Sequence, residues 1–338
     1  MSAEEQPTTN STTGAHGLSG TGRSVLEEME PPSRRSRGAL ALQTFGFLLS
    51  LGALTWAISL AMSEGNRENL ARLRHADTGT LALLGAATIA SVIVNGLMFW
   101  ATILPARRLK AIDVVATNSI AVFLSILPFK LGLVTRVLIH HRRDAIPFKL
   151  IVAWMGAMAA LGLAVFVPLG AAGLWAKSID ARWALAAGLG ILLTHAIGYA
   201  CARAAKRQRW LSRLSLGADE LLSDPRVLCG VGLMRLLDAG LLSARFLIAS
   251  RIAGHDLNMA QATLMGTTFF LITVLSLGGA LGFREGGIAA LALAMGMDEK
   301  ALALIALMVS GSEVVISGLM AAGSCFIIRP DKLLARRG

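Results

Sequence analysis

Apolar residues fall into long runs that are separated by short polar segments. Six runs are uninterrupted, and each is long enough to cross a bilayer core, which needs about 20 apolar residues in a helix. These runs cover residues 38–62, 80–104, 148–174, 182–201, 226–250 and 301–327. The pattern predicts an all-α polytopic membrane protein, because a helix satisfies all its backbone hydrogen bonds inside lipid.

Two further runs, 114–139 and 260–296, are interrupted by glycine, proline and charged residues. Glycine permits backbone conformations that a helix interior disfavours, and proline ends or kinks a helix. We predict that each run turns back inside the membrane as a re-entrant hairpin. The expected hairpin breakers are Pro128, Gly132, Gly278, Gly279 and Gly282.

The charges of the connecting segments favour this arrangement over eight single crossings. Lys and Arg residues cluster in segments 34–37, 105–113, 140–147 and 202–225. Cytoplasmic loops carry an excess of Lys and Arg. Six crossings and two re-entrant hairpins place all these segments and both termini on the cytoplasmic side of the cytoplasmic membrane. Loops 63–79, 175–181 and 297–300 would then lie outside.

Each half of the membrane region, about 38–175 and about 182–328, therefore reads as span, span, hairpin, span. Three crossings is an odd number, so the two halves would be inverted with respect to each other. The two hairpin tips would approach each other near the bilayer midplane. Inverted repeats with paired broken helices are the usual sequence indication of a transporter binding site.

Composition agrees with a membrane protein. Charged residues make up 16% of the chain, against about 25% in soluble domains. The net charge of +11 is typical of basic loops that contact anionic lipid headgroups, and no soluble basic face indicates nucleic acid. Residues 1–37 read as a disordered cytoplasmic tail and residues 329–338 as a basic cytoplasmic tail. No spacing of Cys or His suggests a metal or a cofactor.

Two motifs carry a resemblance to a known family. They are Leu127-Pro128-x-Lys130-x-Gly132-x-x-x-Arg136 and Gly279-x-x-Gly282-x-Arg284-Glu285-Gly286. Together with the order of the spans, they resemble the lysylphosphatidylglycerol synthase transmembrane-region family from about residue 40 to residue 328. The resemblance implies a flippase-like membrane domain. It appears here without the aminoacyltransferase domain of the fused members, so we do not expect lipid aminoacylation.

Ionisable side chains within apolar runs are costly and usually face a cavity or the bundle interior. We expect those in the long runs to form a substrate-binding set. The set comprises Lys130, Arg136, Arg235, Asp238, Arg245, Arg284, Glu285 and Glu313. Arg235, Asp238 and Arg245 lie on one helical stripe. The excess of Arg and Lys indicates a phosphate-bearing headgroup as ligand.

Structural interpretations compete with binding at several of these positions. Arg284 could have Glu313 as a permanent partner, and the Arg235 stripe could be an intrahelical ladder of salt bridges. Arg136 could extend toward the membrane surface, as long basic side chains often do. Asn95 and His195 are expected to form hydrogen bonds between helices.

The function that these features favour is a transporter or flippase of an anionic or isoprenoid-type lipid. One alternative is a membrane-embedded enzyme acting on lipid-linked substrates, with Glu285 or Glu313 as acid or base. Another is a non-transporting partner of a lipid-synthesis enzyme, and a homo-oligomer is compatible with each. No hydrolase, metalloprotease or phosphate-loop motif is present in the sequence.

Overall fold

The computed structural model describes residues 37–127, 130–176, 178–208, 215, 217–276 and 281–329. The chain divides into two units, Met1–Leu42 and Gln43–Gly338. The second unit contains nearly all the described residues, and the contacts below lie within it. Three predicted breakers, Pro128, Gly278 and Gly279, lie outside the described residues, as do almost all of both predicted tails.

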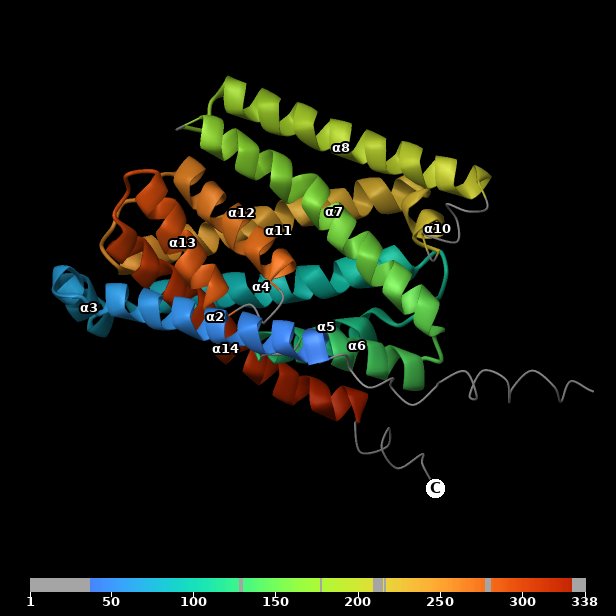
Figure 1. Ribbon diagram of the computed structural model, residues 1–338, viewed down its shortest axis with the longest axis horizontal. Helices are drawn as coiled ribbons and strands as arrows, with labels where there is room; N and C mark the ends of the chain where they lie inside the picture. Colours follow the sequence, from blue (N-terminus) through green and yellow to red (C-terminus); the bar gives the residue numbers. More distant parts are fainter. Residues whose placement is uncertain are drawn as a thin grey trace, which may run out of the picture. The chain divides into compact units, whose positions relative to one another are not determined.

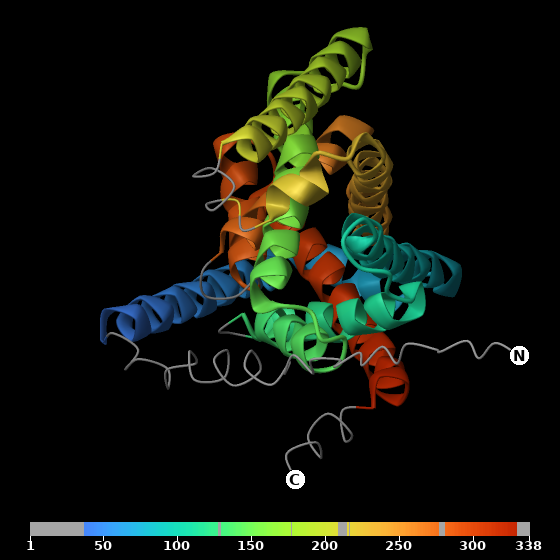
Figure 2. The same cartoon turned by 90° about the vertical axis from the view of Figure 1, so that its right-hand side faces the viewer.

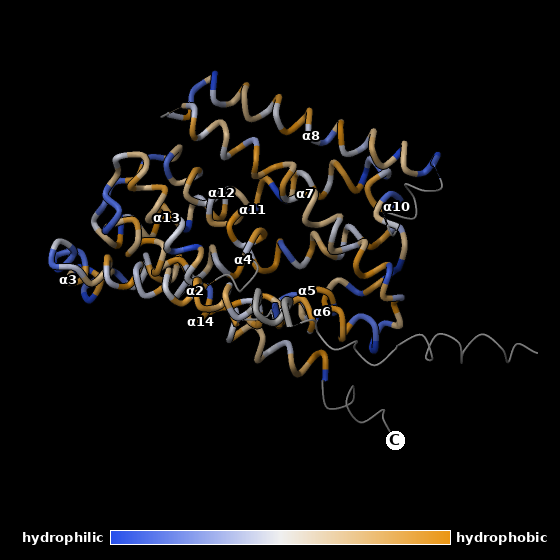
Figure 3. Tube along the Cα trace, in the orientation of Figure 1, coloured by the Kyte–Doolittle hydropathy of each residue, from blue (hydrophilic) through white to orange (hydrophobic). Residues whose placement is uncertain are grey.

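Six helices within the described residues are long and apolar enough to cross a membrane. They match the six uninterrupted runs, so the predicted all-α membrane protein is confirmed. These helices are α2 (Arg37–Ala61), α4 (Thr78–Ile103), α7 (Phe148–Trp175), α8 (Ala181–Arg207), α11 (Pro225–Ile252) and α14 (Glu299–Ile328). Figure 3 shows apolar residues along most of their length and polar residues gathered near the connecting segments. Short connecting helices are η1 (Glu64–Asn66), α3 (Arg67–Arg74) and α10 (Ala218–Leu222).

Polar residues in the connecting segments determine where several helices begin. A side-chain oxygen at the residue before the helix accepts a hydrogen bond from the first-turn backbone and satisfies a free N–H group. The residues that do so are Asp77, Asp180, Asp224, Asn258 and Asp298. The polar segments between apolar runs therefore specify the helix starts locally.

Each interrupted run forms two short helices. The first gives α5 (Ala111–Ile126) and α6 (Leu131–Arg142), and the second gives α12 (Met259–Leu275) and α13 (Phe283–Ala294). With 16 and 17 residues, α5 and α12 are about 24 to 26 Å long at about 1.5 Å per residue. That is less than the hydrocarbon core of about 30 Å.

Contacts between α5 and α6 show that the chain reverses between them. The Arg136 guanidinium donates to Asn118 at 2.6 Å, and Arg143 donates to Asp113 at 2.9 Å. The sequence separation grows from 18 to 30 residues along the pair, as in an antiparallel hairpin. The second pair, α12 and α13, also packs together. In each interrupted run the break thus lies between two helices that pack together.

The glycines at these turns have different physical roles. Gly282, the residue before α13, has φ of +90°, and a Cβ there would lie 2.0 Å from the Ser50 carbonyl oxygen of α2. Gly132, a predicted breaker, lies instead inside α6. A Cβ at Gly132 would meet the Ala121 carbonyl oxygen at 2.1 Å, so glycine is required there for close packing of α5 on α6. Lys130, with φ of +51°, occupies the left-handed position before α6.

The helix contacts follow a reciprocal scheme. Helix α4 packs on α11, while α5 packs on α14 and α12 packs on α7 (Figures 1 and 2). The contacts of α4 with α5, and of α6 with α7, correspond to those of α11 with α12, and of α13 with α14. If α4, α5, α6 and α7 are exchanged with α11, α12, α13 and α14, in that order, the same contacting pairs result. Each hairpin packs its first helix on the last long helix of the other half.

Helix α8 differs from the other long helices because it packs mainly on α7 (Figures 1 and 2). Its exposed residues are large and apolar, among them Leu189 and Leu192, with 57% and 68% of their surface accessible. An exposed apolar face of this length is expected of a helix that faces lipid.

Candidate functional site

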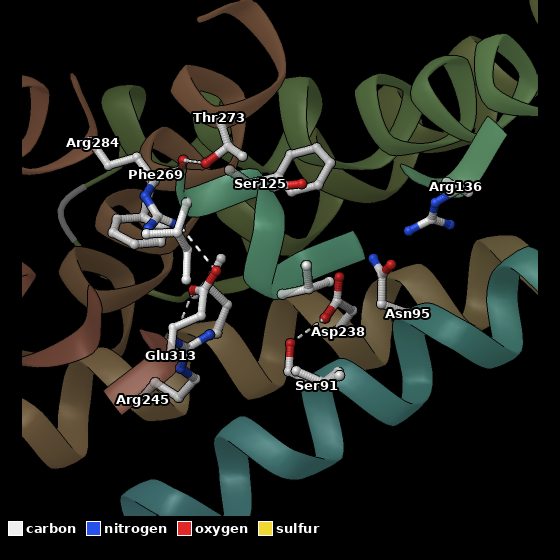
Figure 4. Close-up of a pocket in the computed structure, with 15 residues that line it drawn as sticks. Ser91, Asn95, Ser125, Arg136, Asp238, Arg245, Phe269, Thr273, Arg284 and Glu313 are labelled. Carbon is white, nitrogen blue, oxygen red and sulfur yellow. Dashed lines mark hydrogen bonds and ion pairs between the residues drawn. The ribbon is translucent and has the colours of Figure 1, made fainter. Parts of the chain in front are cut away.

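A cavity of about 240 Å³ lies where the two interrupted runs meet. It is lined by the carboxyl ends of α5 and α12, the first turn of α13, and residues of α4, α6, α11 and α14 (Figure 4). The lining residues are Ser91, Val92, Asn95, Val122, Ser125, Ile126, Arg136, Asp238, Leu242, Arg245, Phe269, Phe270, Thr273, Arg284 and Glu313. Five of the eight charged residues predicted from the sequence are among them.

Glu313 of α14 links two of the predicted arginines at one side of the cavity. Its Oε1 accepts from Arg284 Nη1 at 3.1 Å, and its Oε2 accepts from Arg245 Nη2 at 3.1 Å. Figure 4 shows both contacts converging on the carboxylate. The Arg284 guanidinium also lies 4.3 Å from the centre of the Phe269 ring, within the range of a cation–π contact. Arg284 therefore has the permanent partner that the structural interpretation expected.

Glu285 has a different role from its neighbour Arg284. It is fully buried, accepts a hydrogen bond from the Gly282 N–H at 2.5 Å, and accepts another from the Ser310 hydroxyl. These contacts fix the start of α13 against α14. Glu285 was predicted to bind substrate, but it does not line the cavity. Its contacts hold Gly282, the residue before α13, and Ser310 of α14 together.

Arg235 and Asp238 form a second buried ion pair. Arg235 Nη1 donates to Asp238 Oδ2 at 3.1 Å, and the Ser91 hydroxyl of α4 donates to Asp238 Oδ1 at 2.7 Å. Arg245, on the same stripe of α11, bonds Glu313 instead. The stripe is buried along its length, but its charges form two separate networks with helices α4 and α14.

Arg136 is the exception among the buried arginines. Only 6% of its surface is accessible, so the interpretation that it extends toward the membrane surface is wrong. Its Nη2 donates to the amide oxygen of Asn118, and its guanidinium lies 3.5 Å from the centre of the Phe99 ring. No carboxylate of the described residues lies within ion-pair distance of it. Arg136 thus brings an uncompensated positive charge to the cavity wall.

Lys130 lies away from this wall, at the turn between α5 and α6, and is partly exposed. Arg235 is buried behind the wall rather than in it. The structure therefore brings together Arg136, Asp238 and Arg245 with Arg284 and Glu313, and leaves Lys130, Arg235 and Glu285 outside the lining.

The sequence interpretation did not assign five polar residues to this site, one of which is Ser91, the α4 partner of Asp238. Asn95 was expected to join two helices, but it lines the cavity and has no hydrogen bond to a described residue. Ser125 and Thr273 occupy matching places near the carboxyl ends of α5 and α12. Asn118 is fully buried and connects Arg136 to the α4 backbone at Val92. A polar residue just before each interruption was the available signal.

No cluster of three or more His, Cys, Asp or Glu side chains that could hold a metal occurs in the described part of the chain. The cavity lining supplies guanidinium, amide, hydroxyl and carboxylate groups. Such a set can bind an anion and orient it through hydrogen bonds.

Comparisons with known proteins bear on the whole helical unit. The family model described as the lysylphosphatidylglycerol synthase TM region matches residues 43–320, which include both hairpins and every residue of the cavity. Searches of curated proteins and of solved structures each gave no match. The match covers most of the chain and agrees with the two motifs. The chain therefore belongs to the lysylphosphatidylglycerol synthase transmembrane-region family, a membrane domain tied to lipid handling.

Proposed function

We propose that this protein is a transporter or flippase that carries an anionic or isoprenoid-type lipid across the cytoplasmic membrane. The lipid headgroup would bind in the cavity between the two hairpins. The observation that carries the proposal is the buried guanidinium of Arg136, which faces the cavity without a carboxylate partner among the described residues.

The charge balance around the cavity supports an anionic ligand. The buried cluster contains the arginines 136, 235, 245 and 284 and the carboxylates of Asp238, Glu285 and Glu313. One positive charge remains in excess. An unpaired ion in a medium of low dielectric constant is costly. A phosphate group would offset that cost, and a guanidinium can bind it with two parallel hydrogen bonds.

The arrangement of the helices supports alternating access. The reciprocal helix contacts are those expected if two halves of opposite orientation face each other across the cavity. In this proposal α5–α6 enters from the cytoplasmic side and α12–α13 from the outer side. Movement of one half against the other would change the contacts of α5 with α14 and of α12 with α7, and open the cavity to each side in turn.

The dipoles of the hairpin helices contribute less positive potential at the cavity than two helix amino ends would. The cavity contains the carboxyl ends of α5 and α12 as well as the first turn of α13. A helix carboxyl end carries a partial negative charge and an amino end a partial positive one. The field at the cavity thus comes mainly from the arginines, and the hairpin ends add opposing dipoles.

The enzyme alternative requires a carboxylate that is available to exchange protons. Glu313 accepts from two arginines, Asp238 from Arg235 and Ser91, and Glu285 from the Gly282 N–H and Ser310. An acid–base role would require one of them to leave these partners. The alternative of a non-transporting partner requires a filled cavity, and the space beside Arg136 favours transport instead.

Lipid translocation in reconstituted vesicles tests the proposal. We expect Arg136→Gln to lower the translocation rate of fluorescent phosphatidylglycerol at least tenfold while leaving the melting temperature nearly unchanged, because the change removes an uncompensated charge. Arg142→Gln is the matched control, since Arg142 is an exposed residue of the same helix. Equal translocation by the wild type and Arg136→Gln would exclude a headgroup site at this residue.

A further inference from the structure

A groove of about 590 Å³ lies between α8 and α11, and it shares no lining residue with the cavity described above. Its walls are residues of α8 between Ile191 and Tyr199 and residues of α11 between Pro225 and Leu236. We propose that this groove holds an acyl chain of an anionic phospholipid of the surrounding membrane, with the lipid phosphate beside Arg203. The proposal requires only that these helices cross a membrane, and it does not depend on transport.

The length of the groove matches one leaflet of a bilayer. It covers about 12 Å of α8 and about 16 Å of α11 at about 1.5 Å per residue, and half of the hydrocarbon core measures about 15 Å. The apolar runs of the two helices, 182–201 and 226–250, have their midpoints near residues 191 and 238. The end of α8 lies near the start of α11, beside α10 (Figure 1). The groove thus extends from one membrane surface to about the bilayer middle.

The groove is open toward lipid and its lining is mostly apolar. Leu192 of α8 and Leu233 of α11 line it and have 68% and 67% of their surface accessible. Because no water is present in the bilayer core to fill such a space, hydrocarbon is its expected content. The polar side chains in the lining are His195 and Tyr199, besides the thiol of Cys229.

His195 does not provide a phosphate site in the middle of the groove. Its Nδ1 donates to the Ile191 carbonyl oxygen of its own helix at 2.9 Å, rather than to another helix as the sequence suggested. Its Nε2 is then an acceptor, and it lies against α11, where a Cβ at Gly232 would be 2.9 Å away. A phosphate oxygen gains no hydrogen bond from an acceptor, so the charged end of a ligand belongs at the membrane surface.

Arg203 supplies a cation at that surface. It lies one turn after Tyr199, donates to the Tyr199 hydroxyl at 3.3 Å, and lies 5.5 Å from the centre of the Tyr199 ring. It is exposed and has no ion-pair partner among the described residues. Arg226, which is also exposed, follows Pro225 at the start of α11. Basic residues at a membrane surface attract anionic lipid headgroups.

Nearby carboxylates are engaged away from the groove. Asp224 accepts from the Arg226 backbone N–H at the start of α11. Asp219 and Glu220 of α10 line a separate hollow together with Lys206. The basic end of the groove therefore complements a phosphate. A second copy that covered the groove with the same face would bring like charges together, so charge favours a lipid over a second copy.

The three natural cysteines provide the test. All are exposed, and Cys229 lines the groove while Cys201 and Cys325 do not. The full chain in detergent is treated with N-ethylmaleimide with and without dioleoyl phosphatidic acid, and peptide mass spectrometry reports each site. We expect phosphatidic acid to slow modification of Cys229 about fivefold or more and to leave the other two unchanged. Dioleoyl phosphatidylcholine, which has the same chains and no net charge, should protect much less.

Two charge variants locate the lipid. Arg203→Gln should weaken the protection by phosphatidic acid about fivefold, the effect of one Arg near anionic lipid. Arg182→Gln is the matched control, since Arg182 is an exposed residue at the other end of α8. Arg136→Gln should leave the protection of Cys229 unchanged, because Arg136 lines the cavity and not the groove.

A groove-filling variant gives a second readout. Phosphatidic acid should raise the melting temperature, because a ligand that binds only the folded state stabilises it. Leu192→Trp places a larger side chain in the groove and should reduce that rise by more than half. Leu193→Trp is the control, since Leu193 is the next residue of α8, has 61% of its surface accessible and does not line the groove.

Three results would overturn the proposal. They are equal modification of Cys229 with and without phosphatidic acid, equal protection by phosphatidylcholine, and loss of protection in Arg136→Gln, which would assign the lipid to the cavity. Protection that appears without lipid as the protein concentration rises would assign the groove to a second copy and also overturn it. Protection that depends on Arg203, in a protein that moves no lipid, would support the groove site and contradict transport.

Discussion

Glu313 is the residue on which the charge network of the cavity depends most. It is the shared acceptor of Arg245 and Arg284, and only 16% of its side chain is accessible. Arg284 can be removed and leave Glu313 paired with Arg245. Removal of the Glu313 charge instead leaves Arg245 without a carboxylate and leaves Arg284 with only a longer contact of 4.0 Å to Glu285. The two positions should therefore respond unequally to neutral substitution.

We expect Glu313→Gln to lower the free energy of unfolding by about 3–5 kcal/mol, the usual cost of breaking a buried pair. Arg284→Gln should cost about 1–3 kcal/mol, the cost of a lost hydrogen bond that leaves one group unsatisfied. Melting temperatures in detergent give the order. The double variant should be more stable than Glu313→Gln alone. Equal losses in the two single variants would indicate that water or lipid compensates the charges.

Gly282 combines a left-handed backbone with a close contact. Gly282→Ala should destabilise the protein by more than about 1 kcal/mol, since it adds backbone strain and places a Cβ 2.0 Å from the Ser50 carbonyl oxygen. Gly296→Ala is the control, because Gly296 has φ of +66° but nothing within 4 Å of its Cβ position. Melting temperatures of both variants separate strain from the clash. A smaller loss at Gly282 than at Gly296 would mean that the turn moves freely away from α2.

At the scale of helices, each hairpin depends on how closely its two members approach. The contact of α5 with α6 passes through Gly132, where a Cβ would meet Ala121 and Ser125 atoms at 2.1 Å. Any side chain there must push the two helices apart. Ser125 and Arg136 line the same cavity from these two helices, so the spacing of the helices sets the distance between these two side chains across it.

Gly132→Ala should therefore lower both stability and lipid translocation. Alanine is the better helix former by about 1 kcal/mol, so a loss of stability would come from packing alone. Gly156→Ala in α7 is the control, because nothing lies within 4 Å of its Cβ position, and it should leave stability unchanged or slightly raised. If Gly132→Ala behaves like Gly156→Ala in melting and translocation, the close packing of α5 on α6 is not needed.

At the scale of the whole molecule, helix length and helix direction bear on how the chain crosses the membrane. Helices α5 and α12, with 16 and 17 residues, are shorter than the hydrocarbon core of about 30 Å, and α5 packs antiparallel to α6. Both facts fit six crossings with two re-entrant hairpins. The alternative of eight crossings would place the basic end of α6 outside.

Single-cysteine labelling in intact cells distinguishes these topologies. After replacement of Cys201, Cys229 and Cys325, a cysteine at position 178 should react with a membrane-impermeant reagent added outside. A cysteine at position 142 should react only after the membrane is opened. Both positions are exposed in the protein, so access to the residue is not limiting. Strong labelling of position 142 from outside would contradict the re-entrant arrangement.

The sequence by itself determined the helices. Six apolar runs became six long helices, and two interrupted runs became pairs of short ones, because helix formation in lipid depends on local hydrophobicity and backbone hydrogen bonding. Helix starts at Asp77 and Asp298 were likewise specified by local capping. The sequence also showed which charged residues lie within apolar runs. Such residues are costly in lipid and usually face a cavity or the bundle interior.

Only the tertiary structure decided which of those charges have partners. Arg245 pairs with Glu313, 68 residues away, rather than with Asp238 on its own helix. Asn95 lines the cavity, and Arg136 reaches it without a counter-ion among the described residues. These outcomes depend on which faces of α4, α6, α11 and α14 meet. Packing between helices selects those faces, and the pattern of residues along one helix does not contain the position of the next.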